Sequence, residues 1–274
     1  MTACVACTVA SVAVQAVSPA AYYVATSVAV PLLFAHALCT QARPRLLDFA
    51  VACAVTWVCI GVCMSVCLHR YFSHRAFRTS RGVQFALGLA ACLAFQGDPL
   101  WWAVMHRRHH KHCDASGDPH SSALQGVWYA VVGWMADRAN YDISAHELAS
   151  LGAEVCTLEI RMLGVLYPLC PTLAFFTVAS VHGWATAVYC LLVPMWLARF
   201  ITLLFNHEFH RAPHEDSACR AENATRLLAI AVGESQHHDH HRHPRRARRP
   251  ELDPPYHLVI RSLQKVGLVW ACGA

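Results

Sequence analysis

Long apolar runs alternate with polar stretches along the 274-residue chain. A helix needs about 20 apolar residues to cross the hydrocarbon core of a bilayer. Four runs meet this length and predict transmembrane helices at about 20–39, 47–67, 163–181 and 184–205. Short turns join the first span to the second and the third to the fourth. The pattern therefore predicts two helical hairpins, each of which returns to the side from which it entered.

The segments 68–162 and 206–274 follow the second and fourth spans, so they share one face of the membrane. An apolar stretch at 83–100 is interrupted by the residues QGDP at 96–99, which favours a re-entrant or interfacial segment over a span. No internal repeat or second soluble domain is evident. We therefore expect one all-α integral membrane domain, with four transmembrane helices and a helical cap.

Composition supports a single membrane domain over residues 1–274. Hydrophobic residues make up 56% of the chain and charged residues only 14%, against about 25% charged in a soluble domain. The mean hydropathy is positive. There is no clear signal peptide, because no basic residues precede the first apolar run.

The formal net charge of +5 is unevenly distributed. The cap holds 19 of the 22 Lys and Arg residues, nine in 68–162 and ten in 206–274. The positive-inside rule predicts that the cap is cytosolic, in the endoplasmic reticulum of a eukaryote or the inner membrane of a bacterium. Arg43 and Arg45 lie on the other side and count weakly against this. The basic face suits anionic headgroups, and no nucleic-acid-binding motif is present.

Fourteen cysteines raise the question of disulfides. Cys4 and Cys7 form a CxxC pair in the run 3–17, which is too short for a span and carries no other redox or metal signal. Cysteine inside an apolar segment packs as a small apolar residue. We expect such packing, and no disulfide, for the seven cysteines in apolar segments: Cys53, Cys59, Cys63, Cys67, Cys92, Cys170 and Cys190.

Histidines gather in four short motifs on the predicted cap face. In chain order these are HRYFSH at 69–74, HRRHH at 106–110, NHEFH at 206–210 and HHDHH at 237–241. Neutral imidazole is a good ligand for iron, zinc and copper. Nine imidazoles exceed the needs of one ion, so the motifs predict two. Cysteine is absent from all four motifs, which disfavours structural zinc and iron–sulfur sites.

The spacing within each motif predicts its geometry, because residues three and four apart share a helix face. We expect the three histidines of HRRHH to converge on one point. The same holds for the first, fourth and fifth residues of HHDHH and for the two ends of NHEFH. His69 and His74 are five apart and diverge by about 140° on a regular helix. They therefore bind different metals or meet through a local bulge.

Some histidines near the motifs do not fit this spacing. His112 is expected to face solvent or to stand behind the ligands, and His207 and His238 are not expected to bind metal. His214 competes with His210, which we favour because it lies four residues after Asn206. HEFH is not the HExxH motif of zinc proteases, since position 211 is Arg.

The four motifs, in this order and spacing, resemble those of the membrane fatty-acyl desaturase family in its acyl-CoA-type branch, whose pattern is HxxxxH, HxxHH, NxxxH and HxxHH. The flanking words are also similar: QGDPLWW before the second motif, DPHS and GW after it, and GES before the last. The resemblance covers about 47–243. It implies a four-span helical fold with a cytosolic cap and a non-haem centre of two iron ions.

The resemblance also implies the roles of the site residues. Asn206 would act through a bound water. The reaction would use O2 and two external electrons to remove two hydrogens from adjacent CH2 groups of a fatty-acyl chain. The implied metal ligands are His69, His74, His106, His109, His110, His210, His237, His240 and His241.

An unactivated methylene group offers no acid–base handle, so the substrate needs a strong oxidant in a dry, narrow tunnel. Trp101, Trp102 and the 83–95 segment are candidates for the tunnel wall, with interfacial anchoring as the alternative. Arg199 lies in the fourth span, roughly 10 Å from Asn206 along the helix. It either contacts substrate or extends to the interface. The words near the second motif differ from those of animal stearoyl-CoA enzymes, so CoA, acyl carrier protein and a lipid all remain possible carriers.

The electron donor is expected to be a separate protein of cytochrome b5 or ferredoxin type. His243-Pro244 is followed by Arg-Arg, whereas the haem module of cytochrome b5 has Gly-Gly there. The run RHPRRARR at 242–249 could receive an acidic donor, an acyl carrier protein or CoA phosphates. Lipid headgroups are the alternative. The candidate docking residues are Arg245, Arg246, Arg248 and Arg249.

Two other functions compete with desaturation. A hydroxylase or acetylenase of the same fold differs only in how the oxidised intermediate partitions, which spacing does not separate. A membrane metal transporter or histidine-rich metal-binding protein would place ligands within the spans. There, histidine occurs only at His36 and at the His182 turn. The sequence therefore favours a desaturase.

Overall fold

A computed structural model describes residues 18–41, 43–211 and 219–273 of the chain. Within these ranges the protein is helical apart from one two-stranded sheet. The run 3–17 with its CxxC pair, and His214, lie outside the described residues.

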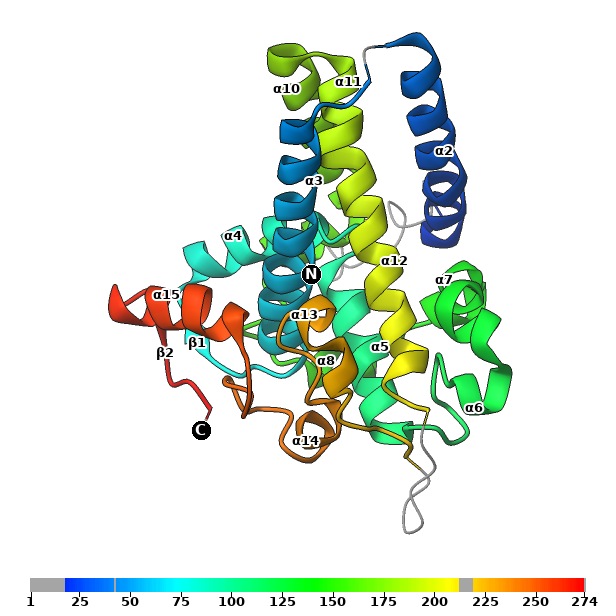
Figure 1. Cartoon of the computed structure of the whole chain (residues 1–274). Helices are drawn as coiled ribbons and strands as arrows, with labels where there is room; N and C mark the ends of the chain where they lie inside the picture. The colour runs from blue at the N-terminus through cyan, green and yellow to red at the C-terminus, as the bar shows by residue number, and fades with distance from the viewer. Residues whose placement is uncertain (1–17, 42, 212–218, 274) are drawn as a thin grey trace, which may run out of the picture.

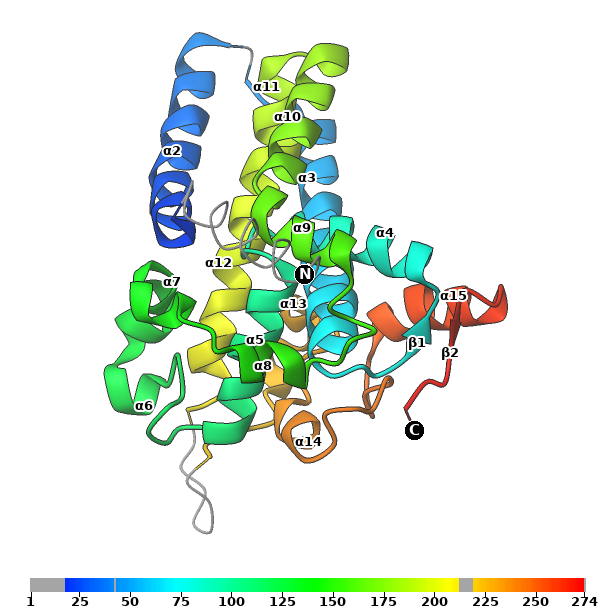
Figure 2. The same ribbon diagram turned by 180° about the vertical axis from the view of Figure 1, so that it is seen from behind.

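Three helices are long and apolar enough to cross a membrane, and they confirm three of the four predicted spans. Their connections lie at one end of the molecule, where the α2–α3 turn stands beside the α10–α11 turn (Figures 1 and 2). This is the arrangement of two hairpins that enter from the same side. The three are Pro19–Thr40 (α2), Leu46–Ser73 (α3, Leu46–Val58, continued by η1, Cys59–Ser73) and Trp184–Glu208 (α11, Trp184–Ala187; η4, Val188–Leu192; α12, Val193–Glu208).

The remaining predicted span, at 163–181, is not one continuous helix. The structure has two helices there, α9 (Leu158–Leu166) and α10 (Leu169–His182), bent by 68° relative to each other. Pro168 lies at the break. A proline favours such a break, because it lacks the N–H that would continue the helix and clashes with the preceding turn. Together the two helices form either a broken fourth span or a re-entrant loop. Gly183 then adopts a φ of +87°, which favours glycine, and turns the chain into α11.

Arg199 of α12 contacts α2 between the membrane-spanning helices. Its side chain is buried, with 1% relative exposure. The guanidinium donates to the Thr26 hydroxyl at 2.9 Å and the Ser27 hydroxyl at 3.0 Å. Its carbon lies 4.8 Å from the ring centroids of both Tyr23 and Phe95, a cation–π arrangement. Extension of Arg199 to the membrane interface is therefore wrong, because the charge is held between helices.

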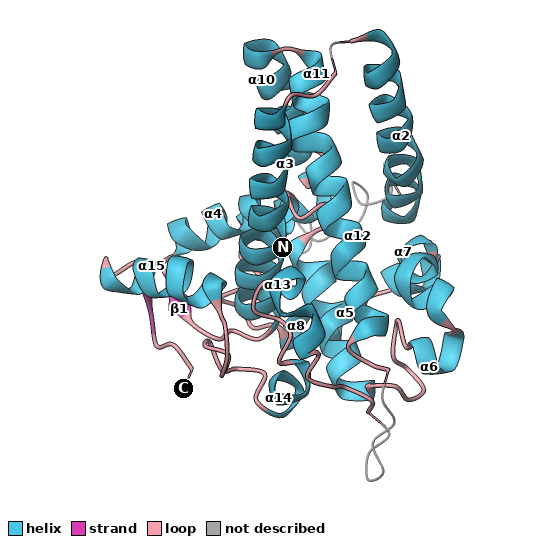
Figure 3. Cartoon of the chain, in the orientation of Figure 1, coloured by secondary structure: helices cyan, strands magenta, loops and turns pink. Residues whose placement is uncertain are grey.

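The cap is built from both polar segments and lies at the end opposite the hairpin turns (Figure 3). The stretch 83–100 holds most of a 12-residue helix, which is too short to span, and a turn that leads into α5. The first segment contains β1 (Arg78–Thr79), α4 (Arg81–Cys92), α5 (Pro99–His112), α6 (Ser122–Gln125), η2 (Tyr129–Gly133), α7 (Trp134–Ala136), η3 (Arg138–Tyr141) and α8 (Ala145–Ser150). The second contains η5 (Thr225–Leu227), α13 (Leu228–Ala231), α14 (His237–Arg242), η6 (Pro255–Ile260), α15 (Arg261–Lys265) and β2 (Val269–Trp270).

The two cap segments are joined by the small sheet. β1 pairs with β2 in antiparallel fashion, with Arg78 opposite Trp270 and Thr79 opposite Val269. This pairing brings the end of the chain back to the residues that follow the second span. The histidine motifs therefore come from segments that the fold packs against one another.

Candidate metal centre

The first histidine motif lies at the end of η1, which is a π-helix over Cys59–Ser73. A π-helix hydrogen-bonds residues five apart, so residues at that spacing share a face. The His74 N–H donates to the His69 carbonyl at 3.2 Å, and their ring centroids are 5.0 Å apart. Of the two alternatives considered from the sequence, the structure therefore favours the second, in which His69 and His74 meet through a local bulge of the helix.

The second motif lies on α5, whose start is fixed by its sequence. Asp98 caps the helix by accepting from the Leu100 and Trp101 N–H groups at 2.9 and 3.0 Å, and Pro99 suits the first helical position. Capping sets where the helix begins, and so the direction in which each later side chain points. His106 lies two turns into the helix.

Five histidines form the first cluster, which we call the five-imidazole cluster. Their ligand-type atoms all lie within 4.8 Å of one another. The Nε2–Nε2 distances are 2.9 Å for His69–His240, 2.8 Å for His74–His106, 3.1 Å for His106–His110 and 2.9 Å for His110–His240.

The other four histidines form the second cluster, the four-imidazole cluster. Its Nε2–Nε2 distances are 3.3 Å for His109–His241, 3.1 Å for His237–His241 and 3.0 Å for His210–His237. The two clusters touch where the rings of His110 and His241 stack, with centroids 4.2 Å apart.

The expectation that each HxxHH motif converges on one point is wrong. On α5, His106 and His110 enter the five-imidazole cluster and His109 enters the other. On α14, His240 enters the five-imidazole cluster. Residues four apart lie nearly in line along a helix, whereas the residue between them in sequence points to one side. Each helix therefore lies between the two clusters and contributes to both.

Three histidines have a carboxylate beside the ring nitrogen that points away from the clusters. A carboxylate accepts the Nδ1 proton, so Nε2 keeps its lone pair and directs it into the cluster. Lone pairs that face one another repel, and a cation between them removes this repulsion. The Nδ1-to-oxygen distances are 3.0 Å for His69–Glu234, 3.0 Å for His109–Asp118 and 2.8 Å for His210–Asp114.

Five imidazoles of the second and fourth motifs are held in the neutral, metal-binding form. Burial, and after it the positive charge of neighbouring groups, holds the pKa of His106, His110, His237, His240 and His241 well below the usual value of 6.5. A protonated imidazole has no lone pair for a metal. The environment therefore favours ligation.

The dimensions of the clusters suit metal ions. An imidazole nitrogen lies about 2.0–2.1 Å from a bound ion such as zinc, so two ligand nitrogens at right angles are about 3 Å apart. The Nε2–Nε2 distances given above for the two clusters run from 2.8 to 3.3 Å. The residues therefore fit two ions, one in each cluster.

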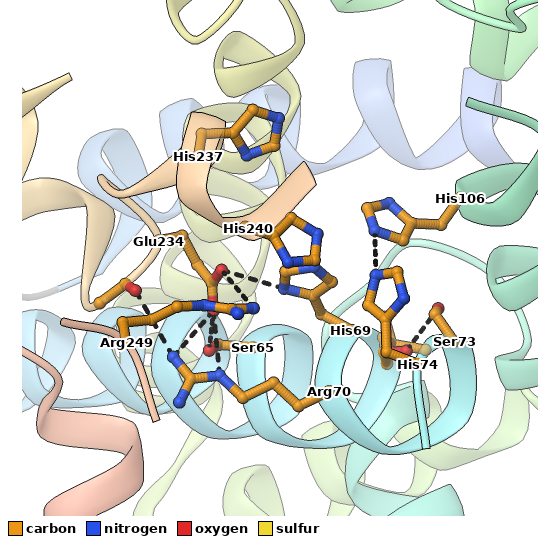
Figure 4. A network of polar contacts seen from close by, with 12 residues as sticks. Ser65, His69, Arg70, Ser73, His74, His106, Glu234, His237, His240 and Arg249 are labelled. Atoms are coloured by element: carbon orange, nitrogen blue, oxygen red, sulfur yellow. Dashed lines mark hydrogen bonds and ion pairs between the residues drawn. The ribbon is translucent and has the colours of Figure 1, made fainter. Parts of the chain in front are cut away.

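A buried ionic network stands behind His69 (Figure 4). Glu234 contacts His69, accepts from the Ser65 hydroxyl and forms an ion pair with Arg70 at 3.1 Å. Arg249 Nη2 lies 3.7 Å from Glu234 Oε2, with 1% of the residue exposed. Arg249 is therefore wrong as a docking residue, because its guanidinium is inside the protein.

A cavity lies beside both clusters, and Trp102 forms part of its wall. The Trp102 ring stacks on His106 at 4.9 Å and 16°, and its Nε1–H donates to Gln96 at 3.2 Å. Gln96 in turn donates to Thr202 at 2.7 Å. Trp101 does not line the cavity. Besides Trp102, Gln96, Thr202 and His106, the lining residues are Met64, His69, Met105, His109, His120, Trp134, Leu203, Phe205, Asn206, Phe209, His210, Glu234 and His237.

Trp101 and Arg199 do not line this cavity. That Trp101 forms part of the substrate tunnel and that Arg199 contacts substrate therefore stay predictions. Trp101 points to the other side of α5, where it stacks on Tyr141 and Trp134 and donates to the Asn140 carbonyl. Consecutive helical residues differ by about 100° in direction, and of this pair Trp102 faces the cavity.

Asn206 lines the cavity near His210 and His237, and its side-chain amide donates to the Ala130 carbonyl at 2.9 Å. His112 is in neither cluster, as expected.

Two cysteines near the metal centre were not identified as a pair from the sequence. Cys113 and Cys219 form a disulfide, whereas the seven cysteines that were expected to pack without one are free. Cys113 Sγ lies 3.8 Å from His210 Nδ1, and Cys219 Sγ lies 3.8 Å from His241 Nδ1. Their separation of 106 residues left no local signal.

The fold and site define a helical membrane protein with a buried centre of nine imidazoles. Residues 47–270 match the model of the fatty acid desaturase family, and the chain belongs to that family. It is a fatty-acyl desaturase, an oxidoreductase.

Three relatives illustrate the range of the family. The chain is 32% identical to a hex-5-enoyl-[acyl-carrier protein] acetylenase of Moorena producens (strain JHB) over 244 residues, covering 78% of this chain and 73% of the relative. It is 26% identical to an sn-1 stearoyl-lipid 9-desaturase of Anabaena variabilis over 226 residues, 80% and 81% of the two chains. It is 28% identical to an acyl-CoA desaturase of Cyprinus carpio over 216 residues, 69% and 63% of the two chains.

Proposed function

We propose that this desaturase is an O2-dependent enzyme with two iron ions, held by the nine clustered histidines and, through a water, by Asn206. The observation that carries the proposal is the meeting of five and four imidazole nitrogens beside one cavity. Nitrogen ligands of this kind suit iron, and no thiolate ligand competes where Cys113 and Cys219 are joined.

The overall reaction balances without an acid or base on the substrate. A –CH2–CH2– unit, O2, two electrons and two protons give –CH=CH– and two molecules of water. Iron bound in the two clusters would supply the activation of O2 that removal of an unactivated hydrogen requires. The protein places the chain and excludes water.

The residues of this chain divide those tasks. Asp114, Asp118 and Glu234 orient three imidazoles through their outer nitrogens. The Trp102 ring and the Gln96–Thr202 hydrogen bond give the cavity a fixed wall beside His106. We propose that the acyl chain lies along this wall.

The cytosolic position of the cap and the identity of the partners belong to the same proposal. The concentration of Lys and Arg on the cap supports the cytosolic side. The two electrons come from a separate one-electron carrier. The names of the three relatives include acyl carrier protein, lipid and CoA as carriers, so all three remain candidates.

Expression in a host of known lipid content tests the proposal. Mass spectrometry of the acyl chains should reveal a new double bond with the wild-type chain and none with His109→Ala or His240→Ala. His112→Ala is the matched control, since it removes an imidazole of the same motif that belongs to neither cluster, and it should keep at least half of the product. Loss of product in all three variants, or its persistence in the first two, would contradict the ligand assignment.

A second function, acetylenase activity, is favoured by one observation: the Moorena producens relative carries that activity in its name. The same mass spectra separate the two. A desaturase product is two mass units lighter than the saturated chain, and an acetylenic product is two units lighter again.

A further inference from the structure

The segment 242–249 follows α14 and combines exposed and buried arginines. Arg242, Arg245 and Arg248 are exposed. Arg246 is half-buried and pairs with Asp239 of α14 at 3.1 Å. Arg249 is buried against Glu234. The segment is therefore fixed to the protein at two points while three of its guanidiniums face outward; these three are called the basic patch below.

The basic patch is far from the membrane. α14 lies at the end of the molecule opposite the α2–α3 and α10–α11 turns, in both views (Figures 1 and 2). The membrane-spanning helices fill the other end. Lipid headgroups lie at the level where these helices emerge, so the patch faces water. This position favours a soluble partner over the headgroup anchoring considered from the sequence.

The charge of the patch is not neutralised locally. Within 18–41, 43–211 and 219–273, no ion pair joins Arg242, Arg245 or Arg248 to a carboxylate. Arg107, from α5, adds to the same field. Burial, and next the charges of Arg75 and Arg245, lowers the pKa of Arg107. A cluster of uncompensated cations attracts an anionic surface and raises the rate at which it associates.

The segment that carries the patch contacts the region behind the metal centre. The Ala247 carbonyl accepts from Arg70 at 2.8 Å, and Arg249 lies against Glu234, which contacts His69 (Figure 4). Asp239, the partner of Arg246, lies between clustered histidines of α14 in sequence. The segment that carries the patch is thus linked to His69 through Arg249 and Glu234.

We propose that Arg242, Arg245 and Arg248 form the docking surface for a soluble, acidic one-electron carrier protein. This rests on the proposed function, because only a redox enzyme with external electrons needs such a carrier. In each docking event the reduced carrier loses one electron and the metal centre gains one, and no bond is made or broken. Two events supply the electrons for one double bond.

The experiment compares two triple variants with equal loss of charge. In the first, Arg242, Arg245 and Arg248 become Gln. In the control, Arg138, Arg261 and Lys265 become Gln; these are exposed cations elsewhere on the cap. The probes are the soluble haem domain of a cytochrome b5 and a [2Fe–2S] ferredoxin. Their Kd is measured by interferometry on full-length protein in nanodiscs, with and without metal, at several salt concentrations.

The patch variant should weaken binding of at least one probe about tenfold and flatten its salt dependence, while the control stays within about twofold. Turnover with dithionite should be unchanged, because that reductant needs no docking surface. Equal Kd values for the wild type and the patch variant would overturn the proposal. So would an equal loss in the control, or a patch variant whose only defect is binding to anionic vesicles.

Failure of the proposed function can be told apart from failure of this inference. A wild-type chain without acyl product would contradict the function, whereas Kd values on metal-free protein do not depend on turnover. Product formation with an unchanged Kd would contradict the docking surface alone.

Discussion

The two halves of the centre use different means to hold a carboxylate behind a histidine. In the five-imidazole half, Glu234 is balanced by guanidiniums of Arg70 and Arg249. In the four-imidazole half, Asp118 accepts from the backbone N–H groups of Asp114 and His120 at 2.8 and 3.1 Å. Glu234 is thus stabilised by buried positive charge and Asp118 by backbone N–H groups.

This difference predicts that a substitution in the five-imidazole half destabilises the fold, whereas one in the four-imidazole half alters the local orientation of a ligand. A buried ion network is costly to break, because the partner that remains is a charge without compensation. A carboxylate held by backbone N–H groups can be replaced by an amide whose oxygen still accepts. Both halves orient a ligand, but only the first also joins distant segments through charge.

The largest stability effect should come from Glu234→Gln. Among the described residues, the substitution leaves Asp253, 2.8 Å from Arg70, as the one carboxylate paired with these two buried arginines. We expect a loss of about 3–5 kcal/mol in unfolding free energy, measured by denaturant titration in detergent. The control is Glu159→Gln, which removes an exposed pair with Arg81 and should leave the unfolding free energy nearly unchanged. Equal losses for both variants would remove the distinction between the halves.

A smaller effect, on metal affinity rather than folding, should come from Asp118→Asn. Asparagine can still accept from the backbone, but it no longer fixes the His109 proton as a carboxylate does. Loss of such an outer partner typically lowers metal affinity or activity about 10- to 100-fold. Competition with a chelator for Fe2+ measures this. Asp137→Asn, which alters a helix cap away from the histidines, should leave the affinity unchanged. A destabilised Asp118→Asn protein with normal affinity would reverse the comparison.

Much of the fold and of the ligand set could be predicted from the sequence, because both are local patterns. Span lengths follow from apolar runs, which give both ends of Pro19–Thr40, and the starts of Leu46–Ser73 and Trp184–Glu208, to within one residue. The histidine motifs identify nine side chains through spacing and resemblance. Their partition into five and four was not predicted, because it depends on where two helices pack against each other.

The features that the sequence did not predict are long-range or conformational. The extended π-helix that aligns His69 with His74 has no clear sequence signal. Glu234 follows His69 by 165 positions, and only the fold brings them together. Arg249 belongs to a run of arginines that looks uniformly solvated, yet one member is buried. Trp101 and Trp102 are adjacent in sequence, and only the direction of α5 decides which of them lines the cavity.

The metal content of the purified protein tests the central claim, that the nine imidazoles hold two ions in two clusters. Elemental mass spectrometry, with protein measured by amino-acid analysis, should find two irons per wild-type chain. His240→Ala and His210→Ala, one from each cluster, should each retain about one, and the double variant none. A wild-type chain with a single ion, or single variants that both keep two, would contradict the account.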